Sequence, residues 1–125
     1  MQTGIMIAQW LLRVCGVIAL LLGLLFWTND ALSLVPLHML LGVLVVLSLW
    51  ALALLGRGAG LPIGMVVGAL IWGLVTLWLG FAQGDLVQSA AHWVIQAIHL
   101  LLGMGAVGLG EMLGGRLRRL RLAVA

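Results

Sequence analysis

Two of the three histidines in this chain lie in long apolar stretches, and their side chains could bind a metal or carry a proton. His38 and His99 are each followed by a glycine four residues later, at Gly42 and Gly103. A neutral imidazole nitrogen is the commonest metal ligand among protein side chains. An ionisable residue inside an apolar membrane helix marks a functional site by default. These two His-xxx-Gly units are therefore the first candidates for a site.

Both units belong to a repeat that covers most of the chain. Its members are Gly16, Gly23, Asp30, His38 and Gly42 in the first copy and Gly73, Gly80, Asp85, His99 and Gly103 in the second. The copies are 57 residues apart at the paired glycines and 61 residues apart at the histidines, and the additional residues include His92. Two copies of two helices each insert the same way up, so a pseudo-two-fold axis runs along the membrane normal. Such symmetry predicts that His38 and His99 face each other.

Composition predicts the elements that must hold these histidines. Hydrophobic residues make up 65% of the chain, charged residues 7%, and the mean hydropathy is +1.31. A soluble domain of 125 residues cannot bury so much apolar surface. Four stretches, over residues 7–27, 34–55, 61–82 and 88–112, are long enough to cross a hydrocarbon layer of about 30 Å as helices. We expect an all-α integral membrane protein: one domain over residues 1–125, folded as an antiparallel four-helix bundle of two tandem two-helix repeats, with its first helix retained.

Charge predicts the orientation of this bundle. The net charge is +3, and all six basic residues are arginines: Arg13, Arg57, Arg116, Arg118, Arg119 and Arg121. They fall on one side of the predicted spans, and the loop aspartates Asp30 and Asp85 fall on the other. Positively charged flanks stay inside, so we expect a multi-pass protein of the bacterial inner (plasma) membrane with both termini in the cytoplasm.

The last residues and two charges inside the spans predict further contacts. Residues 113–125 place leucines at helical spacing among arginines, which is typical of a basic amphipathic tail lying on anionic lipid. Nucleic acid is not an expected partner. Arg13 and Glu111 either pair between the first and fourth helices or reach the interface separately.

One face of the fourth helix carries the polar and very small side chains. The stripe comprises His92, Gln96, His99, Gly103, Ala106 and Gly110. Residues three and four apart share a helix face, and a polar face in lipid turns to the bundle interior. Gln96 is a candidate hydrogen-bond partner for His99. His92 could contact the edge or a propionate of a cofactor, or replace His99 as the partner of His38, although the repeat favours His99.

Two facing imidazoles in an apolar bundle can supply both axial ligands of a haem iron, and the glycine after each histidine clears room for a flat group. In these two His-xxx-Gly units and the four-helix outline, the chain resembles small b-type membrane cytochromes. The resemblance implies one haem b held by His38 and His99, with Gly42, Gly103, His92 and Gln96 around it. Cytochromes of this kind that carry electrons across the bilayer hold two haems on four histidines, and this chain has three.

Distance from the membrane surface narrows the expected role. His38 follows Asp30 by eight residues, which places it within roughly 12 Å of the outer surface along a helix. We therefore expect electron exchange, or haem or gas sensing, in the outer half of the bilayer.

Other functions fit the same residues. The histidines could hydrogen-bond across helices with no cofactor, in a structural or accessory subunit of a larger membrane complex. Three histidines could hold zinc, Met39 and Met104 could add soft ligands for copper, and the polar stripe could serve a small transporter. A ladder of glycines at residues 60, 64 and 68 is typical of helix packing and suggests a homodimer. No catalytic constellation is present, so we do not expect an enzyme.

Overall fold

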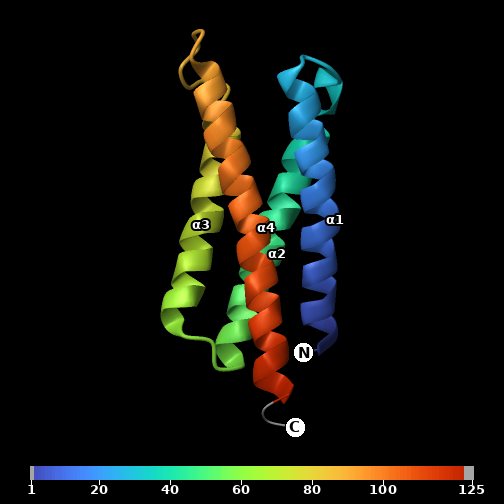
Figure 1. Ribbon diagram of the computed structural model, residues 1–125, viewed down its shortest axis with the longest axis vertical. Helices are drawn as coiled ribbons and strands as arrows, with labels where there is room; N and C mark the ends of the chain where they lie inside the picture. Colours follow the sequence, from blue (N-terminus) through green and yellow to red (C-terminus); the bar gives the residue numbers. More distant parts are fainter. Residues whose placement is uncertain (1, 123–125) are drawn as a thin grey trace.

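Four long helices form an antiparallel bundle in the computed structural model, which describes residues 2–122 and the side chains up to residue 120 (Figure 1). The helices are α1 (Gln2–Trp27), α2 (Val35–Gly58), α3 (Ile63–Ala82) and α4 (His92–Leu122), and a 3-10 turn, η1 (Leu32–Leu34), precedes α2. The described residues contain no strand. Helix α2 packs against the other three helices, and α4 packs against α1 and α3 as well. The predicted all-α, four-helix architecture is confirmed.

Local chemistry explains where the helices stop. Pro36 lies in the first turn of α2, and Pro62 is the residue before α3, positions at which a missing backbone N–H is tolerated. Gly60 takes a φ of 95° in the short turn between α2 and α3, a conformation that favours glycine. The two connections at the opposite end are longer and contain Asp30 and Asp85.

The ends of two helices differ from the prediction. Helix α1 already begins at Gln2, and α4 continues through Leu122 instead of ending at residue 112. The prediction of a separate amphipathic tail is therefore wrong for the described residues, because Leu113 and Leu117 are fully buried in the core. The side chain of Arg121 and residues 123–125 of that predicted tail lie outside the described part. Contact of the arginines with anionic lipid stays a prediction.

Contacts between helices follow the repeat. An added methyl group on Gly16 of α1 would overlap Val107 of α4, and one on Gly73 of α3 would overlap Val46 of α2. Val107 follows Val46 by 61 residues, the spacing that also separates the two histidines. The pairs α1–α2 and α3–α4 are thus two copies of one helical hairpin, packed face to face.

The packed core lies toward the end that holds the N-terminus. Its fully buried side chains there include Leu12, Leu49, Leu52, Leu61, Leu113 and Leu117. Arg13 donates two hydrogen bonds to the carboxylate of Glu111, at 2.6 and 2.8 Å, so of the two alternatives left open by the sequence the inter-helix ion pair is the one that forms. Toward the other end the two hairpins stand apart (Figure 1). We call these regions the packed half and the open half.

The outer surface of the bundle suits lipid. All four helices are long and apolar enough to span a membrane. Large apolar side chains such as Trp10, Leu74, Trp78 and Leu101 are more than half exposed, which a water-soluble protein of this size would not tolerate in such number. The side of the membrane that each end faces stays a prediction.

Candidate functional site

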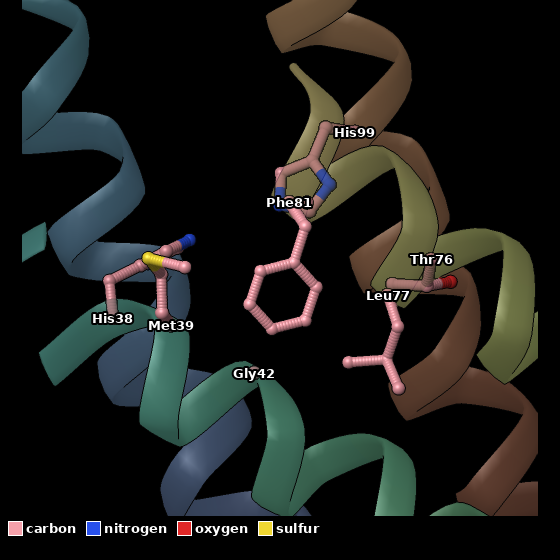
Figure 2. A pocket seen from close by; sticks show the side chains of 8 residues that line it. His38, Met39, Gly42, Thr76, Leu77, Phe81 and His99 are labelled. Carbon is pink, nitrogen blue, oxygen red and sulfur yellow. The ribbon is translucent and has the colours of Figure 1, made fainter. Parts of the chain in front are cut away.

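His38 and His99 come together in the open half. His38 extends from α2 and His99 from α4, and their ring centroids lie 6.2 Å apart with an angle of 63° between the ring planes. They border a cavity of about 40 Å³ (Figure 2). Besides the histidines, its lining consists of Met39, Gly42, Thr76, Leu77, Gly80 and Phe81. No Asp, Glu, Lys or Arg side chain of the described residues lines the cavity, so the two histidines are its only titratable residues.

The imidazole of His38 is held from two sides. Its Nδ1 lies 2.9 Å from the carbonyl oxygen of Ala19 on α1, and the ring of Phe26 packs against it in a T-shaped arrangement at a centroid distance of 5.4 Å. A carbonyl oxygen only accepts hydrogen bonds, so Nδ1 must carry the proton and donate. Nε2 is then left with a free lone pair, the state in which histidine binds a metal.

The imidazole of His99 lacks such a partner. Its Nδ1 is buried, yet no hydrogen bond reaches it in the described structure. Buried polar atoms of native proteins are almost always paired, and leaving one unpaired costs about 1–3 kcal/mol. A histidine kept only for structural hydrogen bonding would not be expected in this state.

Two glycines support the histidines from behind. A methyl group added to Gly23 would lie 3.4 Å from Cε1 of His38, and one added to Gly80 would lie 3.1 Å from Cε1 of His99. Neither glycine was predicted to lie at the site, although both are the second members of the glycine pairs spaced seven residues apart. That repeated pair was the signal that could have identified them.

The glycines that follow the histidines have open space beside them. Nothing lies within 4 Å of the position where a side chain would begin at Gly42 or at Gly103. Gly42 borders the cavity, whereas Gly103 does not. Of these two glycines, only Gly42 therefore leaves room at the cavity.

The remaining predicted site residues lie outside the cavity. His92 is the first residue of α4, and its Nδ1 lies 3.1 Å from the carbonyl oxygen of Leu86 in the α3–α4 connection. Gln96 is half-buried one turn before His99 and does not border the cavity. The structure thus brings together His38 and His99, the pairing that the repeat favoured, and leaves His92 apart.

The donor set limits which metals the site can hold. Within residues 2–122, no three side chains of His, Cys, Asp and Glu gather at one point, so the three histidines do not form the zinc site considered above. Met104 is 54% exposed and away from the cavity, while Met39 borders it. Two imidazoles, with one thioether near them, are the available ligands.

Comparisons with protein-family models, with curated proteins and with solved structures found no match to this chain. A fold alone does not define a function. What the site can do is therefore inferred from its own geometry.

Proposed function

We propose that this four-helix membrane protein binds one haem b, with His38 and His99 as the two axial ligands of the iron. The observation that carries the proposal is the facing pair of imidazoles, 6.2 Å apart between ring centroids, at corresponding positions of a repeat. Haem iron held by two histidines undergoes reversible one-electron chemistry. Electron exchange or gas sensing in one half of the bilayer would follow.

The separation of the rings suits one shared metal ion. A metal–imidazole bond is about 2 Å long, and the ring centroid lies about 1 Å behind the bonding nitrogen. Two imidazoles on opposite sides of one ion therefore have centroids roughly 6 Å apart. The ring centroids of His38 and His99 are at that separation.

Space for the porphyrin would come from the open half of the bundle. The cavity of about 40 Å³ is smaller than the roughly 300 Å³ or more of most cofactor sites. Phe81, at 58% exposed, and Met39, at 37% exposed, lie on its outer side. Movement of these two side chains, with further separation of the hairpins, would enlarge the cavity, and Gly42 adds no bulk there.

The unpaired nitrogen of His99 favours a bound group over a structural role. In an accessory subunit without a cofactor, an inward-facing imidazole is retained because its hydrogen bonds stabilise the bundle. His38 meets that expectation through Ala19, but His99 does not. Ligation of a metal would supply a reason to keep an imidazole at position 99.

Absorption spectroscopy tests the proposal. The full-length protein is purified in detergent, incubated with haemin and freed of excess haem. We expect a Soret band that shifts on reduction, with the spectrum of a low-spin, six-coordinate haem. His38→Ala and His99→Ala should each abolish the low-spin spectrum.

The third histidine supplies a matched control for this experiment. His92→Ala removes an imidazole that lies outside the cavity, and we expect its spectrum to match that of the unmodified protein. The same variants are checked by circular dichroism for retained helix. Unmodified protein that stays colourless, or a low-spin spectrum that survives both cavity substitutions, would overturn the haem proposal.

A second candidate, a copper ion, is favoured by the small size of the cavity. A volume of about 40 Å³ accommodates an ion without rearrangement, and Met39 offers the soft thioether that copper prefers. Metal analysis of the purified protein separates the two candidates. Copper at one ion per chain, lost in Met39→Leu, would support the second, and iron with a Soret band would support the first.

A further inference from the structure

The two histidines occupy corresponding positions but have different surroundings. Residues of α3 correspond to residues of α1 that precede them by 57 positions. Ala19, whose carbonyl oxygen binds His38, corresponds to Thr76. Phe26, which contacts the ring of His38, corresponds to Gln83 at the 57-residue spacing of the glycines and to Phe81 at the 55-residue spacing of the aspartates. Neither Thr76 nor Gln83 hydrogen-bonds to Nδ1 of His99, which has no partner in the described structure.

The counterparts are engaged elsewhere. The hydroxyl of Thr76 donates to the carbonyl oxygen of Trp72 at 2.8 Å, within its own helix. The side-chain amide of Gln83 lies 3.5 Å from the carbonyl oxygen of Gly80. The α1 side of the repeat therefore fixes its histidine, while the α3 side leaves its histidine unanchored.

Packing beside the two histidines also differs. One turn after His38, Leu41 is buried in the core, whereas the corresponding Leu102 of α4 is only half-buried. Gly80 also lies closer to His99 than Gly23 lies to His38, at 3.1 Å against 3.4 Å for an added methyl group. His99 is thus in closer contact with its glycine than His38 is, while the leucine one turn after His99 is less buried than the leucine one turn after His38.

We propose that the two histidines hold the haem unequally: His38 is the fixed ligand, and His99 is the ligand that a small uncharged molecule displaces. This inference rests on the proposed function and makes the protein a binder of diatomic gas molecules. A ligating histidine is normally oriented by a hydrogen bond at its other nitrogen, which His38 has and His99 lacks. The cavity lining beside His99 is apolar apart from Thr76, which suits a neutral ligand.

Carbon monoxide is the probe for this inequality. The haem-loaded, reduced protein is titrated with carbon monoxide, and binding is followed by the shift of the Soret band. We expect the unmodified protein to bind it. His99→Ala should retain haem and bind carbon monoxide at least about tenfold more tightly, because no histidine has to leave first. His38→Ala should lose most of its haem.

A rescue experiment keeps the result interpretable if a variant folds poorly. Free imidazole added to His99→Gly should restore the low-spin spectrum, since it replaces the missing ligand in an otherwise intact site. Equal haem retention and equal carbon monoxide affinity in His38→Ala and His99→Ala would overturn the inequality while leaving haem binding intact. Absence of haem from the unmodified protein would instead overturn the proposed function.

Exchanging side chains between corresponding positions of the two repeat copies gives a pair of matched variants. Gln83→Phe places an aromatic ring at the position that precedes His99 as Phe26 precedes His38 at the spacing of the glycines, so we expect weaker carbon monoxide binding. Phe26→Gln removes that ring from His38, so we expect less retained haem. Tighter carbon monoxide binding in Gln83→Phe, more retained haem in Phe26→Gln, or no change in either variant would contradict the proposal that neighbouring residues make the two histidines unequal.

The protein without haem offers an independent measurement. In nuclear magnetic resonance spectra of protein labelled with ¹⁵N at histidine, His38 should show a single Nδ1–H form whose proton exchanges slowly with water. His99 should show no protected ring proton. Equal protection at both rings would overturn the inference without any reference to haem.

Discussion

The packed half and the open half of this bundle are built from the same four helices, but they differ in how closely those helices pack. The packed half buries apolar side chains from every helix and joins α1 to α4 through Arg13 and Glu111. The open half replaces these contacts with glycines, two imidazoles and a cavity. Lipid offers no hydrophobic drive for helix association, so close packing must hold the bundle. One half can supply that packing while the other keeps space for a ligand.

The largest expected effect is on stability, in the packed half. Leu12 is fully buried and contacts Gly110 across the α1–α4 interface. Leu12→Ala should lower the free energy of unfolding by about 2–5 kcal/mol, because it removes packing and leaves a void. Denaturant unfolding in detergent, followed by circular dichroism, measures this. The Soret band of the folded variant should be unchanged, and its loss would contradict the division of roles.

Next in size is the ion pair that links α1 and α4. Glu111→Gln leaves Arg13 without its carboxylate, so the thermal unfolding temperature should fall. The double variant Arg13→Gln, Glu111→Gln should be more stable than the two single effects predict together, because the pair acts as a unit. Thermal melts of the four proteins test this. Strict additivity would mean that the ion pair contributes nothing.

A smaller effect is expected where glycine supports a histidine. Gly80→Ala requires His99 to move by a few tenths of an ångström, whereas Gly23→Ala makes ordinary contact with His38. Alanine is favoured over glycine in a helix by about 1 kcal/mol, so Gly23→Ala should be neutral or stabilising. Gly80→Ala should gain less stability and bind haem more weakly. The reverse order in haem titrations would show that Gly80 is not a support.

The smallest effect is expected at the open side of the cavity. Gly42→Ala meets no neighbour within 4 Å, so its unfolding free energy should rise by at most about 1 kcal/mol. The added methyl group would still narrow the cavity, and haem affinity should fall a few-fold. Gly64→Ala, also without neighbours but distant from the cavity, is the control. Equal haem affinity in both variants would contradict a role for Gly42.

Much of the architecture could be predicted from sequence patterns, because a lipid bilayer restricts which structures can span it. Hydropathy predicted the four helices, and the repeat predicted that His38 and His99 face each other, because symmetry fixes position without knowledge of side-chain contacts. The same patterns failed for residues 113–122. Leucines among arginines are typical of a surface helix, but Leu117 packs beside Gly56 of α2 at the end of the bundle, a tertiary contact that local spacing does not contain.

The finer features of the site depend on contacts between helices. Spacing placed Gly23 and Gly80 on helix faces, but it could not tell which neighbour each face meets. The hydrogen bond from His38 uses a backbone carbonyl, which every residue carries, so no residue type marks it. The unpaired nitrogen of His99 is likewise visible only when the surroundings of both rings are compared.

A haem titration of the purified full-length protein tests the central claim most directly. The Soret absorbance should rise linearly and saturate at one haem per chain, and the variant carrying both His38→Ala and His99→Ala should show no saturable binding. Leu12→Ala, altered only in the packed half, should saturate at the same ratio. Saturable binding that survives the loss of both imidazoles, or none in the unmodified protein, would contradict the account.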